Sequence, residues 1–230
     1  MKIVFSTGAG VSAESGISTF RDAGGLWEKY PVMQVASAEG FRENPELIHK
    51  FYNDRRKQLL EAQPNEAHKL IAALQDQHDV SVITQNVDDL HERAGSSDVL
   101  HLHGELMKIR SVYDPNYIET LTPPDIFTSV DTRGANGDPM RPHIVFFGEA
   151  VPNMDKAVEL TAQADLFVVI GTSLNVYPAA GLVQCTTPGT PIVYIDPNPA
   201  SISLPNLTVI PRKATEGMEL LYRKLTETAK

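Results

Sequence analysis

A glycine-rich segment, Gly8-Ala-Gly-Val-Ser-Ala-Glu-Ser-Gly16, follows the first apolar run of the chain. Glycines let the backbone turn tightly and approach a pyrophosphate, and the helix start that follows donates amide hydrogens to phosphate. The spacing G-x-G-x-x-x-x-x-G differs from the dinucleotide fingerprint G-x-G-x-x-G. The segment therefore indicates either a phosphate-binding loop or a purely structural glycine turn.

His103 closes another apolar run and precedes Gly104, whose missing side chain leaves room for a ligand. Imidazole exchanges a proton near neutral pH, so a histidine at the end of a strand can act as a general base. His101 lies on the same face of the strand by the two-residue period. We expect structural roles for His101 and for His91.

Tyr52 and Arg55 are three residues apart in a segment with helical periodicity, which puts them on one helical face. A phenol and a guanidinium can together bind a carboxylate, the guanidinium through two parallel hydrogen bonds. The alternative is that Tyr52 packs in the interior and Arg55 lies in solvent.

Short apolar runs, typical of strands, alternate with segments of helical periodicity. The expected strands are Ile3–Ser6, Val80–Thr84, Val99–His103, Ile144–Phe147, Leu166–Ile170 and Ile192–Ile195, and the expected helices are Pro45–Leu60, Pro64–Gln77 and Pro211–Ala229. The alternation predicts an α/β fold with a doubly wound, mostly parallel, Rossmann-like sheet. Ligands of such sheets bind at the carboxyl ends of the strands, where the motifs above lie.

Two stretches fit this alternation poorly. Asp22–Tyr52 is rich in loop residues, and Glu105–Pro142 holds five prolines. We interpret both as insertions that form a small second lobe of a single domain spanning residues 1–230. The expected large lobe is about 1–22, 60–104 and 143–230, and the expected small lobe is about 23–59 and 105–142.

Composition excludes several classes of protein. Hydrophobic residues make up 42% and charged residues 21%, as in globular domains, and the net charge of −9 argues against a nucleic-acid binder. No apolar run reaches the ~20 residues of a membrane span, and no signal peptide is recognisable. We expect a cytoplasmic monomer with neither nucleic acid nor membrane as partner. Cys185 is the single cysteine, which excludes an internal disulfide and a cysteine-based zinc site.

Taken together, the motifs resemble those of the sirtuins, a family of NAD-dependent protein-lysine deacylases. The matching segments, in order, are Gly8-Ala-Gly-Val-Ser-Ala-Glu-Ser-Gly-Ile-Ser-Thr-Phe-Arg21, Thr84-Gln-Asn-Val-Asp88 with Leu90-His91, His101-Leu-His-Gly104, Pro142-His-Ile-Val-Phe-Phe-Gly-Glu149 and Gly171-Thr-Ser173. The resemblance extends from about Lys2 to Leu225 and implies the same α/β fold with NAD as cofactor.

The resemblance also implies a reaction. The acyl-lysine carbonyl oxygen attacks C1′ of the NAD ribose as nicotinamide leaves, and His103 acts as general base on the ribose hydroxyls. The products are free lysine and 2′-O-acyl-ADP-ribose. The partners are therefore proteins or peptides that carry acylated lysine.

By the same resemblance, Asn86 and Asp88 line the nicotinamide pocket beside Ile17, Gln85 holds the ribose, Phe20 shields the reacting carbon and Arg21 lies near the phosphates. Thr172 and Ser173 donate hydrogen bonds to phosphate or ribose, or else only cap a helix. The implied NAD-binding residues are Gly8, Ala9, Gly10, Ser12, Ala13, Ile17, Phe20, Arg21, Gln85, Asn86, Asp88, Gly171, Thr172, Ser173, Asp196, Asn198 and Ala214.

Asp196 departs from the family, which usually has asparagine near the adenosine ribose at this position. An aspartate can accept both ribose hydroxyls and would repel a 2′-phosphate, so we expect NAD to be preferred over NADP. Asn198 and Ala214 are weaker candidates for adenosine contacts, and both could instead be ordinary loop residues.

The implied substrate-binding residues are Val145, Phe146, Phe147, Gly148 and Glu149. They resemble the family's strand that pairs with the substrate backbone by β-augmentation and borders an apolar tunnel for the lysine stem. A core strand is the alternative, and the two roles are compatible because alternate side chains face opposite ways.

Tyr52 and Arg55 match the Tyr-x-x-Arg pattern of the sirtuin branch that removes succinyl and malonyl groups. The resemblance therefore implies a deacetylase that is also a desuccinylase or demalonylase.

Most sirtuins hold the small lobe with a zinc ion on four cysteines after the catalytic histidine. Glu105–Pro142 contains no cysteine, and Ser111 lies where the first would be expected. We therefore expect no zinc. Either the lobe is mobile, or apolar packing replaces the metal through Ile109, Val112, Tyr113, Tyr117, Ile126 and Phe127.

Two other functions stay open from the sequence. ADP-ribosyl transfer or NAD hydrolysis would keep the NAD motifs without an acyl-lysine tunnel, and the intact Val145–Glu149 segment disfavours both. A non-catalytic NAD-binding module is disfavoured by His103, Asn86 and Asp88.

Overall fold

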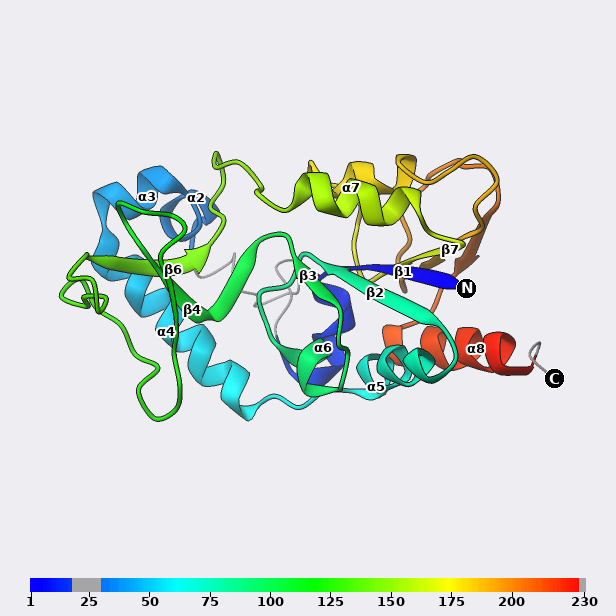
Figure 1. Ribbon diagram of the computed structural model, residues 1–230, viewed down its shortest axis with the longest axis horizontal. Coiled ribbons are helices and arrows are strands. Elements are labelled where there is room, and N and C mark those ends of the chain that lie inside the picture. Colours follow the sequence, from blue (N-terminus) through cyan, green and yellow to red (C-terminus); the bar gives the residue numbers. More distant parts are fainter. Residues whose placement is uncertain (18–29, 228–230) are drawn as a thin grey trace.

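A computed structural model describes residues 1–17 and 30–227 of the chain. Its core is a six-stranded sheet with the strand order β3-β2-β1-β7-β8-β9, in which all paired strands are parallel (Figure 1). The strands are β1 Lys2–Thr7, β2 Asp79–Thr84, β3 Val99–His101, β7 Leu166–Ile170, β8 Ile192–Ile195 and β9 Leu207–Ile210. The strand order reverses between β1 and β7, which is where ligands of such sheets bind.

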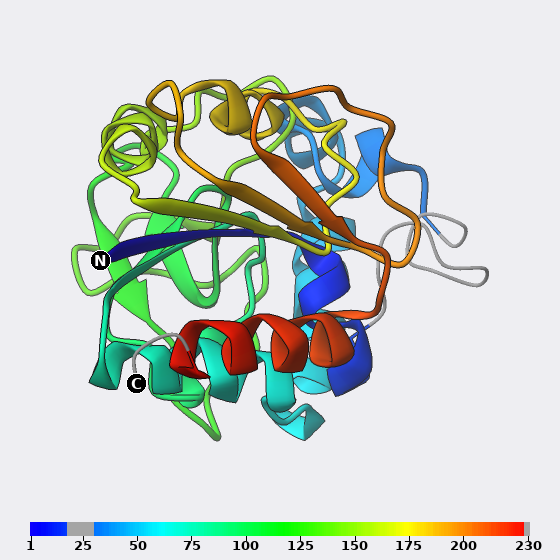
Figure 2. The same ribbon diagram turned by 90° about the vertical axis from the view of Figure 1, so that its right-hand side faces the viewer.

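Helices cover both faces of this sheet, as Figure 2 shows. On one face, α5 (Glu66–Ala73) and α8 (Ala214–Glu227) pack on β1, β2, β7 and β8. On the other face lie α7 (Met154–Ala162) and the 3-10 helix η4 (Ala179–Gln184). Burial on both faces explains why β7 is apolar throughout, and the predicted doubly wound α/β fold is confirmed.

The helix predictions hold where a cap marks the start of the helix. Asn44 accepts a hydrogen bond from Leu47 N at 3.0 Å and begins α4 (Pro45–Glu61). Asn65 accepts from Ala67 N at 3.0 Å and begins α5, which continues into η3 (Leu74–Asp76). None of the described helices is both long enough and apolar enough to cross a membrane.

The small lobe contains an antiparallel sheet with the order β5-β4-β6. Its elements are β4 Gly104–Ser111, β5 Ile118–Thr120, β6 Met140–Ile144, α2 Val32–Val35 and α3 Ala38–Glu43, with α4 packed on β4 and β6. The remaining short elements are η1 Ala9–Val11, η2 Ala13–Ser15 and α6 Leu90–Arg93. Helix α4 of the first stretch thus packs on two strands that lie mainly in the second.

One predicted strand, Ile144–Phe147, is wrong. The strand at this place is β6, which ends at Ile144 and pairs with β4 across the expected lobe boundary at residue 142. The chain then leaves the sheet, and Phe147 forms only an isolated bridge with Ser37. Gly148 has a φ of +89°, which turns the chain away from an extended path.

Polar contacts support the segment of the small lobe around Ser111. Ser111 accepts hydrogen bonds from the backbone amides of Tyr113 and Asp114 at 3.0 Å each, and it donates to Asp138 Oδ2. Of the apolar residues expected to replace the metal, Ile109 and Ile126 are buried, whereas Val112, Tyr113 and Phe127 are exposed. Within the described ranges, no group of three or more His, Cys, Asp or Glu side chains is placed to hold a metal ion.

Arg56 is the centre of a second polar cluster in this lobe. Its side chain is fully buried on α4, and Nε donates to the Leu106 carbonyl of β4 at 2.6 Å. Nη1 donates to Asn53 Oδ1 at 2.8 Å and to Thr128 Oγ1 at 3.2 Å. Asn53 also donates from Nδ2 to the Thr128 carbonyl at 2.8 Å. Arg56 therefore ties β4 and the loop around Thr128 to one helix.

We expect Arg56→Met to lower the free energy of unfolding by about 2–4 kcal/mol, because it leaves buried acceptors without their donor. Lys57→Met, an exposed neighbour on the same helix, should change it by less than about 0.5 kcal/mol. Urea unfolding followed by circular dichroism measures both. A metal chelator should leave the wild-type curve unchanged; a large chelator effect, or equal values for both variants, would refute this account of the lobe.

Candidate active site

The predicted motifs meet at one edge of the parallel sheet. β1 ends at Thr7, β2 at Thr84 and β7 at Ile170, all at their carboxyl ends. Backbone hydrogen bonds join the segments that follow: Gln85 N donates to the Thr7 carbonyl at 2.9 Å, and Gly8 N donates to the Ile170 carbonyl at 2.9 Å. The motifs that follow β1, β2 and β7 therefore form one site at the point where the strand order reverses.

Close contact between two backbone segments explains why the first motif contains glycine. Gly10 N donates to the Gly171 carbonyl at 2.8 Å, and a Cβ atom on Gly10 would lie 2.6 Å from Gly171 Cα. Gly171 has a φ of +63°, and a Cβ atom there would meet Val11 N at 2.4 Å. Two loops thus touch backbone to backbone, and larger residues cannot occupy Gly10 or Gly171.

A buried network connects the first motif to the second. Asn86 Nδ2 donates to Ser12 Oγ at 3.1 Å, and Ser12 Oγ donates to Asp88 Oδ2 at 3.0 Å. The other carboxylate oxygen of Asp88 accepts from Leu90 N at 3.2 Å. Burial raises the pKa of Asp88, and the hydrogen bonds from Leu90 and Ser12 act against that rise. The arrangement holds an amide and a carboxylate side by side in a dry environment.

His68 extends this network and was not predicted as a site residue. Its Nδ1 accepts from Asn65 N at 3.3 Å, so the hydrogen lies on Nε2, which faces Ser12 Oγ at 3.4 Å. Burial lowers the pKa of His68 to about 4, so the ring is neutral at pH 7. The signal that could have found it is its position three residues after Asn65, the spacing of a capping box.

His103 is held in one tautomer by the second motif. Its Nδ1 lies 3.0 Å from the Gln85 carbonyl oxygen. A carbonyl only accepts, so Nδ1 carries the hydrogen and Nε2 keeps its lone pair. Nε2 has no hydrogen-bond partner among the described residues, and burial lowers the pKa of the ring. The half-buried His103 is thus a neutral base at physiological pH.

The Gly171-Thr-Ser173 motif is tied to the same edge. Gln85 Nε2 donates to Thr172 Oγ1 at 3.3 Å, and the hydroxyl of Tyr194 donates to the Thr172 carbonyl at 2.8 Å. The next helical segment begins only at Ala179, so helix capping does not explain Thr172 and Ser173.

The residues predicted to contact adenosine lie after β8 and at the start of α8. Asp196 follows β8 directly, and its Oδ1 accepts from Asn198 N at 2.8 Å. Ala214 begins α8, and its side chain is buried in the core. Ala9 and Gly10 are half-buried and Ala13 is exposed in the glycine segment. Phe20 and Arg21 lie outside the described residues.

Tyr52 and Arg55 both point inward from α4, with exposed fractions of 4% and 7%. The alternative that Arg55 lies in solvent is therefore wrong. The Tyr52 ring lies 6.1 Å from that of Phe146, and both pack in one cluster with Ile17. Burial raises the pKa of Tyr52, which keeps the phenol neutral. Burial lowers the pKa of Arg55, against which the charges of Tyr52 and Asp88 act. A neutral donor and a guanidinium thus lie near the Asp88 network.

The segment after β6 is a loop whose conformation is held by side-chain contacts. Phe146 is buried under the Arg141 guanidinium, 3.9 Å from the ring centroid, whereas Phe147 is 49% exposed. Glu149 accepts from Arg141 Nη1 at 2.6 Å, from Arg110 Nη2 at 3.1 Å and from Phe146 N at 2.8 Å. The carboxylate of Glu149 therefore fixes the turn from within the protein. The backbone of Val145 is held by a hydrogen bond from its N to the His103 carbonyl at 2.9 Å.

Comparisons with known proteins agree on one family. The Sir2 family model matches residues 8–178. A curated Bacteroides thetaiotaomicron protein named NAD-dependent protein deacylase is 53% identical over 227 residues, 97% of each chain. A protein of the same name from Helicobacter pylori strain 26695 is 49% identical over 228 residues, 99% of this chain and 98% of the relative.

Solved structures agree with the sequence comparisons. A Sir2 homologue in complex with NAD is 38% identical, with a TM-score of 0.89 over 100% of this chain and 91% of that one. The ADP-ribose complex of a point mutant of a Sir2 homologue is 37% identical, with a TM-score of 0.90 over 99% of this chain and 93% of that one.

Proposed function

The chain belongs to the Sir2 family and is an NAD-dependent protein deacylase; on that premise we propose which of its residues carry the reaction and which acyl groups it removes. His103 is the general base, Asn86 and Asp88 form the nicotinamide side of the site, and Tyr52 and Arg55 receive the far end of the acyl group. The observation that carries this proposal is the orientation of His103, whose Nδ1 is held by the Gln85 carbonyl while Nε2 stays able to accept a proton.

The residues present fit NAD. A carboxamide needs both a donor and an acceptor, and the Asn86 amide and the Asp88 carboxylate supply these groups in a buried setting. Asp196 would accept the hydroxyls of the adenosine ribose and repel a 2′-phosphate, which favours NAD over NADP. When bound, NAD supplies a glycosidic bond whose cleavage leaves an electrophilic sugar carbon. The remaining predicted contacts, including Phe20 and Arg21, are proposed from the sequence alone.

The substrate is an acylated lysine in a protein or peptide. We assign its backbone to the loop of Val145–Gly148, where Phe147 is exposed beside backbone fixed through Phe146 and Glu149. Glu149 is saturated by two arginines, so its proposed part is to shape this loop rather than to touch the peptide.

Tyr52 and Arg55 favour an acidic acyl group. Their positions on one buried helical face offer a neutral phenol and a cation where an acyl chain entering beside Phe146 would end. A succinyl or malonyl carboxylate would gain charge-assisted hydrogen bonds there. An acetyl group is too short to reach them, so the proposed enzyme prefers acidic acyl groups. Acetyl groups are removed as well, without this added binding.

Products identified by mass spectrometry test the proposal. The purified protein is incubated with NAD and one peptide that carries acetyl-, malonyl- or succinyl-lysine. Free lysine together with O-acyl-ADP-ribose is the expected outcome. Plain ADP-ribose would indicate NAD hydrolysis, an ADP-ribosylated acceptor would indicate ADP-ribosyl transfer, and unchanged NAD would indicate a binding module; each of these results contradicts the proposal.

A further inference from the structure

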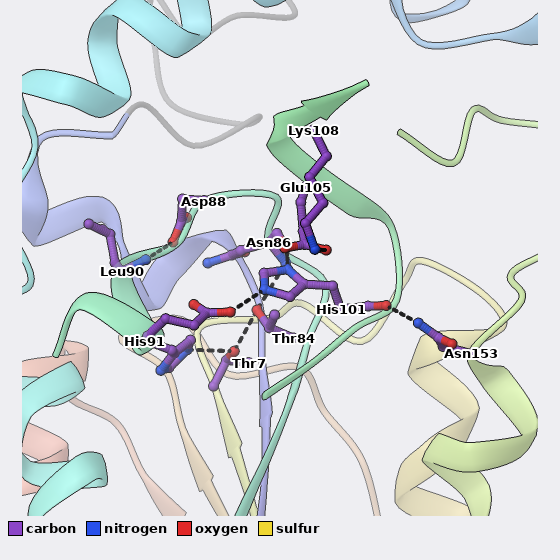
Figure 3. A network of polar contacts seen from close by, with 11 residues as sticks. Thr7, Thr84, Asn86, Asp88, Leu90, His91, His101, Glu105, Lys108 and Asn153 are labelled. Carbon is purple, nitrogen blue, oxygen red and sulfur yellow. Dashed lines mark hydrogen bonds and ion pairs between the residues drawn. The ribbon is translucent and has the colours of Figure 1, made fainter. Parts of the chain in front are cut away.

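His101, two residues before the proposed base, makes contacts that a structural core histidine does not need. The ring is buried at the end of β3, with 8% of the residue exposed. Nδ1 lies 3.0 Å from the Asn86 carbonyl oxygen, and Nε2 lies 2.7 Å from Glu92 Oε1 on α6. The backbone of His101 is also held in place, because Asn153 Nδ2 donates to its carbonyl at 2.8 Å (Figure 3).

These two partners determine the charge of the ring. A carbonyl oxygen and an ionised carboxylate can only accept hydrogen bonds, so both ring nitrogens of His101 must carry hydrogens. Burial lowers the pKa of His101, but the hydrogen bond and charge of Glu92, with Glu105 and the Asn86 carbonyl, outweigh it and the pKa is raised. The carboxylate pKa of Glu92 is lowered: burial raises it, and the bond to His101 outweighs the burial. Geometry and charge thus agree on an imidazolium.

The two histidines of this motif hold two successive carbonyls. His103 binds the carbonyl of Gln85 through Nδ1, and His101 binds the carbonyl of Asn86 through Nδ1. Asn86 is held at two further points, by its own N–H on Thr84 Oγ1 at 3.0 Å and by its side chain on Ser12. The His101 bond is the charge-assisted one, and such bonds are about twice as strong as neutral ones.

The charged groups around His101 are of both signs. Glu92 and Glu105 lie on the side that favours the imidazolium, and Glu105 is itself paired with Lys108 at 2.7 Å. Asp88 also interacts favourably, since the charge of His101 lowers the pKa of that carboxyl group against the effect of burial. The neighbouring His91 is neutral, because burial lowers its pKa far below the ordinary value.

We propose that His101 is a positioning residue for the deacylation: held by Glu92, it is a lasting cation that fixes the Asn86 carbonyl and so orients the amide and carboxylate assigned to nicotinamide. The inference rests on the proposed function of that loop. It predicts that the hydrogen bond from His101 to the Asn86 carbonyl loses its charge assistance and weakens when His101 loses one of its two ring protons, and that Glu92 sets the pH at which this occurs.

The first test uses the protein without NAD. In nitrogen-15 NMR of the histidine rings, His101 should show two protonated nitrogens at neutral pH and lose one only at alkaline pH. Glu92→Gln should lower its titration midpoint by about 1 to 3 pH units, because a close opposite charge is removed. Glu92→Asp should restore most of the shift. Glu105→Gln is the matched control, since it removes an equal charge without a hydrogen bond to His101, and it should shift the midpoint much less.

The second test separates positioning from mere support. The kcat/KM for NAD of Glu92→Gln should equal that of wild type near about pH 6 and fall about tenfold below it near about pH 8.5, chiefly through KM, as His101 becomes neutral. A loss by one factor at every pH would show a structural role only and overturn the proposal.

Two further outcomes decide the case. A wild-type His101 that is neutral at pH 7 would overturn the inference outright. If no deacylation occurs at all, the proposed function fails, yet the NMR titration and the binding of free nicotinamide at both pH values still judge His101. Nicotinamide binding to Glu92→Gln that is unchanged relative to wild type at alkaline pH would then overturn it.

Discussion

His103→Ala is expected to lower kcat for deacylation by at least ~100-fold, the lower range for a positioned general base. NAD binding, measured by isothermal titration calorimetry, should remain within a few-fold of wild type, because the imidazole binds the Gln85 carbonyl rather than closing the core. His78→Ala removes a half-buried histidine before β2, at the opposite edge of the sheet, and should leave kcat unchanged. Near-normal turnover by His103→Ala would remove this residue from the mechanism.

The pH dependence of the wild-type enzyme gives a further measure of the same base. Burial lowers the pKa of His103 below its ordinary value of 6.5, so the ring stays unprotonated at neutral pH. The rate should therefore persist through about pH 6.5 and decline only at more acidic pH, as the base becomes protonated. This decline in rate at acidic pH should be absent from the residual activity of His103→Ala.

Arg55→Met is expected to lower kcat/KM for a succinyl-lysine peptide by about 10- to 150-fold, the loss of one charge-assisted hydrogen bond of about 1.5–3 kcal/mol. Turnover of the same peptide with acetyl-lysine should change far less, because an acetyl group lacks the carboxylate. Methionine matches the length of the buried arginine stem, and circular dichroism verifies the fold. Both peptides are assayed at saturating NAD.

Three companion variants sharpen this comparison. Arg55→Lys keeps a positive charge and should recover part of the succinyl activity, but not all, because an ammonium lacks the planar fork. Tyr52→Phe deletes one neutral donor and should show the same bias more weakly. Lys57→Met, exposed on the same helix, should affect neither substrate. If Arg55→Met loses both activities equally, the pair only supports the small lobe, and the preference for acidic acyl groups must be abandoned.

Elements whose burial pattern is local could be predicted from the sequence. β1, β2, β7 and β8 are covered on both faces, and each therefore contains a short, mainly apolar run. β9 is an edge strand with exposed Thr208 and Val209, and it was not predicted. The small antiparallel sheet was missed because its strands depend on one another: β6 contains Pro142 and becomes a strand only by pairing with β4.

The site, like the fold, could be predicted only in part from the sequence. The motifs were placed correctly at strand ends because a parallel sheet brings its carboxyl ends to one edge. Most of the contacts that orient these histidines could not be predicted, since they depend on how separate segments meet in the fold. Ser12 meets His68 across 56 positions, and the tautomer of His103 depends on a carbonyl 18 positions away. His101 was expected to be structural, and only its two acceptors indicate otherwise.

In the proposed reaction, one site couples the loss of nicotinamide to removal of the acyl group. The most direct test is to measure both in one reaction, quantifying nicotinamide by chromatography and freed lysine by mass spectrometry with a succinyl-lysine peptide. Equal amounts of nicotinamide and freed lysine are expected at every time point, with almost no nicotinamide when the peptide carries unmodified lysine. Nicotinamide release at an undiminished rate without an acylated peptide would contradict it.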